Sequence, residues 1–126
     1  MSKFFFILLL LSSSVFAADP WTRADTYRET TFQVLNIIDW GQTRYTAKHP
    51  ERFKENGAGA GGSAWLIGEH PSTTDVDRLM VMSAILHPVI SYYLPHGWRE
   101  AFQYVTIGMK LDATIGNASV GVKVSF

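Results

Sequence analysis

The sequence contains no cysteine, which excludes disulfide bonds, thiolate metal sites and cysteine nucleophiles. It has no excess of either charge, since 11 Lys and Arg balance 11 Asp and Glu, so no net field attracts nucleic acid. Charged residues make up only 17% of the chain, against roughly 25% in soluble globular proteins. Apolar residues make up 47%, too many for an intrinsically disordered chain. With 126 residues, this composition predicts one folded domain, no nucleic-acid partner and a membrane contact.

The N-terminal apolar run is too short to be an ordinary membrane-spanning helix. Phe4–Leu11 has eight residues, whereas a span needs about 20. The run follows Lys3 and precedes small residues that end at Ala17, which is the order of parts in a secretory signal peptide. We therefore expect residues 1–17 to be removed and the protein to be exported, to the inner membrane or periplasm of a Gram-negative bacterium. An uncleaved N-terminal anchor is the alternative.

The remaining residues, 18–126, are predicted to form a single small domain that is mainly α. Residue patterns typical of helices occupy about three segments, which are residues 23–46, 72–94 and 98–114. The glycine-rich run 57–63 is predicted to be a flexible loop. Apolar and polar side chains alternate in the last nine residues, which predicts a short C-terminal strand or an extended tail.

Two ionisable side chains lie within apolar helical segments and are the candidate functional residues. Asp39 lies in the first predicted helix and His87 in the second. Burying an unpaired carboxylate costs several kcal/mol, so we expect the two side chains to contact each other between packed helices. The alternative is that each one lines a wet cleft or caps local backbone. The predicted buried polar seam consists of Asn36, Asp39, Ser83, His87 and Ser91.

No motif of a reaction centre is present. The four histidines form no His-Glu-x-x-His metal motif, and Gly61-Gly62-Ser63 lacks the second glycine of a nucleophile elbow. We therefore predict no enzyme activity, no catalytic or metal-binding residue and no cofactor. The alternative hypothesis is a periplasmic metal-binding protein or small enzyme that uses Asp39, His70 and His87.

A membrane contact is favoured by Leu79–Leu94, a stretch of sixteen residues without a formally charged side chain. As a helix this stretch extends about 24 Å, less than the roughly 30 Å hydrocarbon core of a bilayer. Tyr92, Tyr93 and Trp98 at one end resemble the aromatic residues of a membrane interface. A small soluble domain has few other segments to cover such a helix, so we expect membrane association. The alternating C-terminal residues leave a second alternative, an outer-membrane β-type protein.

Three short strings resemble a group of small proteins of unknown activity from proteobacteria and their phages. The strings are Asp39-Trp40-Gly41-Gln42-Thr43-Arg44, Glu55-Asn56 and Gly68-Glu69-His70-Pro71-Ser72. The group's pattern is Asp-Trp-x-Gln-Thr, then Glu-x-Asn-Pro-Ile-Leu-Gly-x-His-Pro-Ser, then a histidine-containing hydrophobic helix ending near Leu-Pro. Leu94-Pro95 and Asn117 match its later features, but the Asn-Pro step is missing. The resemblance implies a helical, membrane-associated protein, often of prophage origin, and it supplies no catalytic residues.

These observations together predict a non-enzymatic envelope protein located at the membrane or in the periplasm. If it is phage-encoded, we expect it to modify the host envelope, for example by excluding a second phage. Its expected partners are the membrane and another envelope protein.

Overall fold

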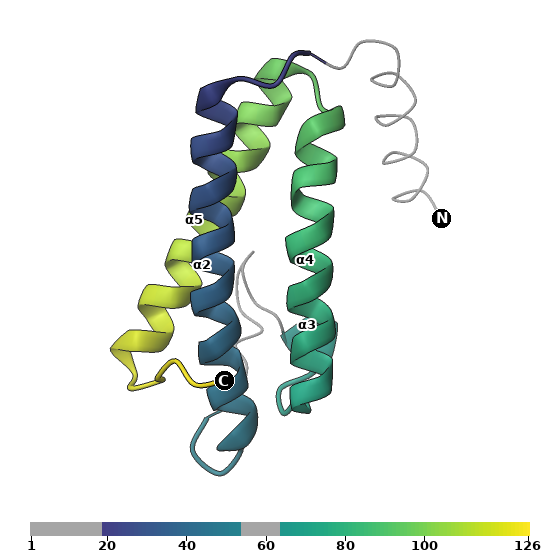
Figure 1. The fold of residues 1–126 in the computed structure, drawn as a ribbon. Helices are drawn as coiled ribbons and strands as arrows, with labels where there is room; N and C mark the ends of the chain where they lie inside the picture. Colours follow the sequence, from purple (N-terminus) through teal and green to yellow (C-terminus); the bar gives the residue numbers. More distant parts are fainter. Residues whose placement is uncertain (1–18, 54–63) are drawn as a thin grey trace.

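The computed structural model describes residues 19–53 and 64–126, which fold into helices without a strand among them. The helices are α2 (Arg23–Lys48), α3 (Ala64–Ile67), α4 (Thr73–Tyr93) and α5 (His96–Ser119). The three long helices form a bundle in which α4 runs antiparallel to α2 and α5 (Figure 1). The predicted mainly α fold is confirmed, and within these ranges no helix is both long and apolar enough to cross a membrane. The predicted signal peptide (1–17) and glycine-rich loop (57–63) lie outside the described residues.

Both α2 and α4 begin at a capping box, in which a hydroxyl and a carboxylate three residues apart exchange hydrogen bonds with the backbone. At α2 the Thr22 hydroxyl accepts from the Asp25 amide, and the Asp25 carboxylate accepts from the Thr22 amide. Ser72 and Asp75 form the same pair at α4. These bonds satisfy backbone groups that have no partner within the helix, so they fix where each helix starts. The predicted start of the second long helix is confirmed.

The end of α5 lies beyond the predicted end at residue 114, because the helix is terminated by Gly121. This glycine has a φ of +92°, a left-handed conformation that other residues adopt with strain. Its amide donates to the Ala118 carbonyl (3.2 Å), and the Val122 amide donates to the Asn117 carbonyl (3.0 Å). These two bonds form a Schellman motif, which satisfies the last carbonyls of the helix. Ile115-Gly116-Asn117-Ala118, a run typical of a turn that favoured the earlier end, therefore lies inside the last turns of α5.

The chain beyond α5 forms a turn and then a tail, without a strand, that lies across α2 (Figure 1). The Ser125 amide donates to the Gly41 carbonyl over 3.1 Å. A side chain at Gly41 would overlap Val124, so the absence of one allows the tail to approach the helix closely. Phe126 lies edge-on to Trp40, with ring centroids 6.2 Å apart.

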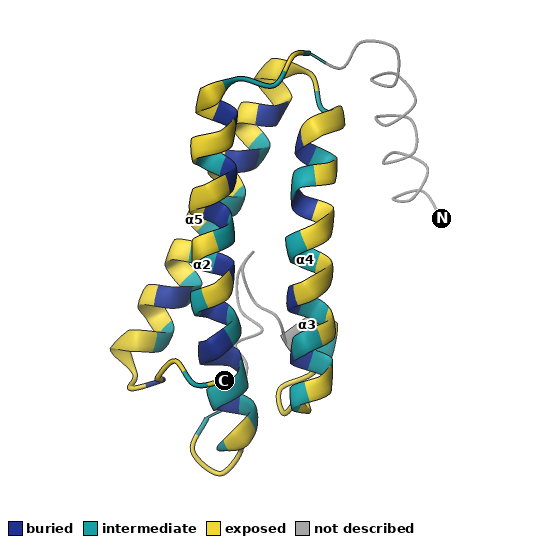
Figure 2. Ribbon diagram, in the orientation of Figure 1, coloured by how far each residue is buried: buried dark blue, intermediate teal, exposed yellow. Residues whose placement is uncertain are grey.

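The bundle has a polar interior, and many large apolar side chains lie on its outer surface. Figure 2 shows that the buried positions follow the sides on which the long helices face one another. Among the described residues only four apolar side chains besides Pro71 are buried, whereas soluble domains bury mostly apolar side chains. The four are Phe32, Val76, Met80 and Val122. The buried polar and charged residues number twelve: Asp25, Glu29, Asn36, Asp39, Gln42, Thr43, Thr46, His87, Ser91, Arg99, Gln103 and Thr114.

Candidate functional site

The candidate site is this polar interior, which is built from side chains that repeat every three or four residues along α2 and α5. Residues at that spacing share one face of a helix, the face that in most bundles carries leucine, isoleucine or valine. Here the same face carries hydrogen-bonding groups. They are Asp25, Glu29, Asn36, Asp39, Thr43 and Thr46 on α2, and Arg99, Gln103, Thr106, Lys110 and Thr114 on α5. The position between Glu29 and Asn36 is taken by an apolar residue, Phe32.

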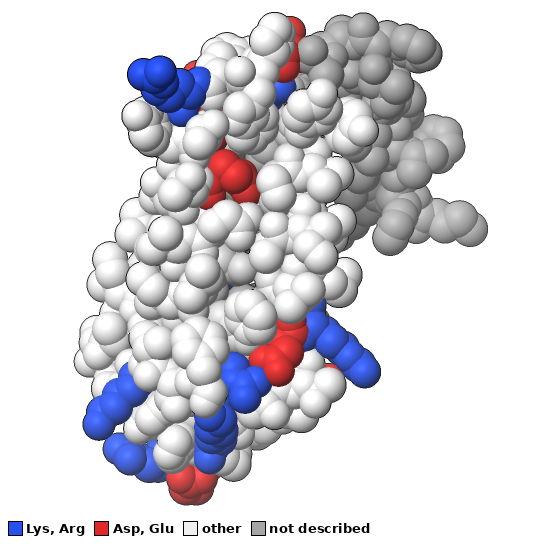
Figure 3. Space-filling view, in the orientation of Figure 1, with Lys and Arg blue, Asp and Glu red and all other residues white. Residues whose placement is uncertain are grey.

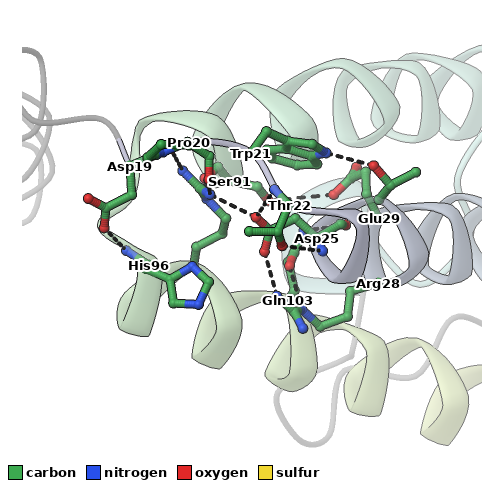
Figure 4. Close-up of polar contacts among 12 residues, drawn as sticks. Asp19, Pro20, Trp21, Thr22, Asp25, Arg28, Glu29, Ser91, His96 and Gln103 are labelled. Atoms are coloured by element: carbon green, nitrogen blue, oxygen red, sulfur yellow. Dashed lines mark hydrogen bonds and ion pairs between the residues drawn. The ribbon is translucent and has the colours of Figure 1, made fainter.

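Arg99 is the centre of the polar contacts at one end of the bundle. Figure 4 shows its neighbours Asp19, Pro20, Asp25 and Ser91. Its guanidinium forms an ion pair with the Asp25 carboxylate over 2.8 Å, and both side chains are completely buried. A guanidinium has five N–H donors, and five bonds are formed here. The four remaining acceptors are the main-chain carbonyls of Asp19, Pro20, Ser91 and Tyr92, at 2.7 to 3.2 Å. Arg99 therefore joins α5 to α2, to α4 and to the segment before α2.

Arg99 also completes the end of α4, and Asp19 completes the start of α5. The carbonyls of Ser91 and Tyr92 belong to the last turn of α4, where no following amide of the helix can donate to them. A cation is favourable at this position because the C-terminal end of a helix carries a partial negative charge. α5 starts after Pro95, which makes no side-chain cap. The Asp19 carboxylate replaces that cap by accepting from the His96 amide over 2.6 Å.

The Asp25 carboxylate has a second cationic neighbour. Arg28 donates to it over 2.5 Å and also donates to the Gln103 side-chain carbonyl over 2.7 Å. The Gln103 amide in turn donates to the main-chain carbonyl of Asp25. Burial alone would raise the pKa of Asp25, but hydrogen bonds from Thr22 and Arg99 and the charge of Arg99 hold it below its usual range.

Glu29, His87 and Thr106 form a continuous row of hydrogen bonds across all three long helices. His87 Nδ1 lies 2.7 Å from Glu29 Oε2, and His87 Nε2 lies 2.7 Å from Thr106 Oγ1. The imidazole ring stacks on Phe32 at a centroid distance of 3.5 Å and on Phe102 at 4.7 Å. The ring is 4% exposed, so the two phenyl rings separate it from water.

The Glu29 carboxylate is held by a second side chain, Gln33, whose Nε2 donates to Glu29 Oε1 over 2.9 Å. Burial alone would raise the pKa of Glu29. Hydrogen bonds from His87 and Gln33 and the charge of His87 together lower it below its usual range. The pair is therefore built for an ionised carboxylate facing a histidine that donates through Nδ1.

Asp39, which the sequence analysis paired with His87, is paired instead with Lys110 of α5. Lys110 Nζ lies 2.6 Å from Asp39 Oδ2, and the Thr43 hydroxyl donates to Asp39 Oδ1 over 3.3 Å. His87 takes Glu29 as its carboxylate partner. The predicted Asp39–His87 contact is therefore wrong, because each group has found a different partner along the same interior.

The other residues of the predicted seam differ in their surroundings. Asn36 is buried and donates to the Met80 carbonyl of α4 over 3.2 Å. Ser91 is buried, and its hydroxyl donates to the His87 carbonyl. Ser83 is half-buried and bonds to the Leu79 carbonyl of its own helix, so it does not join the helices.

The opposite end of the bundle is joined by a more exposed ion pair. Arg44 of α2 donates to both Asp77 oxygens of α4, at 2.6 and 2.7 Å, and Trp40 donates to Oδ1 over 2.8 Å. Hydrogen bonds from Arg44 and Trp40 hold the pKa of Asp77 below its usual range. The Asp77 side chain is 41% exposed, so this pair is screened by water.

Sequence reasoning missed Arg99, Glu29 and Lys110, the ionic partners of the interior. They lie in stretches that contain other charged residues, where a charge does not stand out as it does at Asp39. A detectable signal was present, because Arg99, Gln103, Thr106, Lys110 and Thr114 repeat at spacings of three and four. A helix face that is polar at every such position predicts a polar interface when the other faces are apolar.

The row of carboxylate, imidazole and hydroxyl has the order of a catalytic triad, but its surroundings do not suit nucleophilic attack. The Thr106 hydroxyl also lies 2.8 Å from the Phe102 carbonyl, the usual acceptor of a threonine in a helix. The stacked phenyl rings occupy both faces of the imidazole. The arrangement is therefore suited to joining helices and to holding a proton.

The residues named in the metal-binding hypothesis do not come together. His70 is exposed and precedes α4, whereas Asp39 and His87 are buried and bonded to other side chains. In the described part of the chain, no three His, Asp or Glu side chains are grouped so that they could hold a metal ion. Comparison of the chain with known protein families, with curated protein sequences and with solved structures finds no match.

Proposed function

We propose that this chain is a non-enzymatic envelope protein that is held at a membrane by the apolar outer surface of its helix bundle. The proposal rests on a distribution of side chains that is the reverse of that in most soluble proteins, which bury apolar side chains and expose charged ones. Nineteen large apolar residues are exposed in the described part of the chain, whereas the ion pairs of Asp25, Glu29 and Asp39 lie inside. Burying one such side chain contributes about 1.5–3 kcal/mol, so water is a poor solvent for this surface.

Lipid is the occupant that suits the shape of this surface. The exposed apolar side chains lie on all three long helices rather than on one patch, and a folded protein partner covers one side only. Examples are Ile37 on α2, Ile85 and Val89 on α4, and Val105 and Ile115 on α5, which are 45% to 65% exposed. Acyl chains are fluid, so they can contact apolar side chains on more than one face of the bundle.

The placement of charge also favours lipid. Figure 3 shows one face on which blue and red atoms gather towards the two ends, with a band of uncharged atoms between them. On α4, Leu79–Leu94 has no charged residue and forms an uncharged band along the helix. Tyr92, Tyr93 and Trp98 are exposed at the end where α4 meets α5. Such aromatic side chains favour the boundary between acyl chains and headgroups.

The polar interior supports the same proposal. In an apolar medium the hydrophobic effect no longer drives helices together, and interhelical hydrogen bonds and close packing do. Ionisable groups in such a medium face the interior and pair with one another. The pairs Asp25–Arg99, Glu29–His87 and Asp39–Lys110 have this arrangement.

Flotation with vesicles of phosphatidylethanolamine and phosphatidylglycerol tests the proposal. We expect the purified full chain to float with the vesicles in a density gradient. Ile85→Lys, which places a charge on the outer surface, should reduce the bound fraction about tenfold or more. Thr74→Lys is the matched control, because it adds the same charge to α4 at an exposed position outside the uncharged band. A wild-type chain that stays in solution, as a monomer or as a dimer hiding this surface, would contradict the proposal.

The role in the envelope is proposed on the resemblance to phage-related proteins and on the interior, whose polar side chains are buried and bonded to one another. We propose that the chain changes the envelope of its host so that a second phage is excluded. Expression of the full chain should lower the plating efficiency of at least one phage in a panel, and Ile85→Lys should restore it. Equal plating of the whole panel with and without expression would contradict this role.

A further inference from the structure

The hydrogen bonds around His87 leave one proton position open. Glu29 is ionised and can only accept, so His87 Nδ1 carries a proton. The other ring nitrogen faces Thr106 Oγ1, a hydroxyl that is able to donate or to accept. That hydroxyl lies 2.8 Å from the Phe102 carbonyl and 3.0 Å from the Gln103 carbonyl. It therefore has an alternative acceptor within its own helix.

Two complete hydrogen-bond patterns follow from these distances. In the first, His87 is a cation, Nε2 donates to Thr106, and the hydroxyl donates to the Phe102 carbonyl. In the second, His87 is neutral, and the hydroxyl turns to donate to Nε2. The two patterns differ by one proton on Nε2 and by the rotation of one O–H bond, and neither leaves a side-chain polar atom of the row without a partner.

We propose that Glu29, His87 and Thr106 form a proton-binding site inside the bundle, at which His87 gains or loses a proton while the fold stays intact. The ligand is a proton from water. It enters from the Thr106 side, because Thr106 is half-buried whereas His87 is buried. The Thr106 hydroxyl positions the proton, and Glu29 fixes the orientation of the ring.

The charges around the ring leave Glu29 as the one that faces it. On α4, the described residues from Leu79 to Leu94 include no charged group. On α5, Arg99 is bonded to Asp25, and Lys110 is bonded to Asp39. On α2, Arg28 is also bonded to Asp25. The site therefore depends on one carboxylate and one hydroxyl, and it does not require the bundle to be at a membrane.

Nuclear magnetic resonance of histidine-¹⁵N-labelled full chain tests this site between pH 5 and pH 9. The ¹⁵N shifts of His87 should change from those of a cation to those of a neutral ring protonated at Nδ1, while the helical circular dichroism stays constant. A single His87 protonation state across this range, or loss of helix in step with the change, would overturn the proposal.

Substitutions of Thr106 separate the site from a merely structural contact. Thr106→Val keeps the shape of the side chain but removes the hydroxyl. The bond from cationic His87 to this hydroxyl is stronger than the bond from the hydroxyl to neutral His87, so its loss should lower the proton affinity of His87 about tenfold. Thr106→Ser retains the hydroxyl and should keep the wild-type midpoint. His96, which is exposed, is an internal reference whose midpoint should be equal in all three proteins. An unchanged His87 midpoint in Thr106→Val would overturn the proposal, and if that variant fails to fold, the wild-type titration still decides.

Discussion

Gln33 of α2 donates a hydrogen bond to the main-chain carbonyl of Ala84 in α4, over 3.1 Å. Ala84 lies four residues before Pro88, which sits inside α4 and has no amide to offer that carbonyl. A side chain of one helix therefore completes the backbone of another at the point where proline interrupts it. Gln33 Nε2 also donates to Glu29. Gln33 therefore links the proline-interrupted turn of α4 to the row of Glu29, His87 and Thr106.

Gln33→Leu should therefore lower the free energy of unfolding by about 1–3 kcal/mol, because the carbonyl of half-buried Ala84 and the buried Glu29 carboxylate each lose a donor. Pro88→Ala restores an amide to α4. In that background the cost of Gln33→Leu should be smaller by about 1 kcal/mol. Equal costs in both backgrounds, measured by chemical denaturation, would show that Gln33 does not compensate for the proline.

Asp25→Ala should be among the most destabilising substitutions in the chain. It leaves the Arg99 guanidinium buried without its counter-ion, which costs about 3–5 kcal/mol. Asp77→Ala is the matched control, since it removes an ion pair that is partly exposed, and it should cost much less. Similar decreases in the free energy of unfolding of the two variants would mean that the buried pair stabilises the fold no more than the exposed one.

Acid should unfold the bundle through Asp25 and Glu29, whose pKa values are both lowered in the folded state. The unfolded chain then takes up protons at a higher pH than the folded one does. The stabilising contribution of the two carboxylates is fully present above their unfolded pKa values of about 4, and it is lost as the pH falls through the lower folded values. Denaturation between pH 2 and pH 6 should show this decline, and Glu29→Gln should reduce its slope. A slope that Glu29→Gln leaves unchanged would contradict the assignment.

Gly41→Leu should detach the C-terminal tail from α2 while leaving the helix formed. The added side chain would overlap Val124 and push the tail away, so the Ser125 amide could no longer donate to the Gly41 carbonyl. Hydrogen exchange at the Ser125 amide should then approach the rate of an unstructured peptide, whereas Gly108→Leu, at an open position, should leave that rate unchanged. Retained protection in Gly41→Leu would show that the tail is not held by this contact.

The sequence was sufficient to predict the helices, because their signals are local. α2 starts at Arg23 and α4 starts directly after Ser72, as the residue patterns predicted. The end of α5 was misplaced because a turn-forming Gly-Asn pair is tolerated inside a helix, and only the conformation of Gly121 reveals the true end. The turn tendency of Gly116-Asn117 was outweighed by the hydrogen bonds that the Gly121 and Val122 amides form at the end of the helix.

The interior could be predicted in its location but not in its pairs. Asp39 and His87 stood out because each lies among apolar residues, and both are buried. Which side chains form pairs depends on how far one helix is shifted along another, and that shift cannot be predicted from the sequence of either helix alone. Asp39 therefore meets Lys110, and His87 meets Glu29.

The central claim is that the apolar side chains face lipid while the polar side chains face one another. Because the chain has no cysteine, a spin label can be attached at a single introduced cysteine, at Ile85 on the outer surface or at Thr74 at the end of α4. In vesicles, a label at Ile85 should collide readily with oxygen, which dissolves in lipid, and rarely with a water-soluble nickel complex. A label at Thr74 should show the reverse. If nickel reaches both labels equally well, the outer surface of the bundle faces water and the account is contradicted.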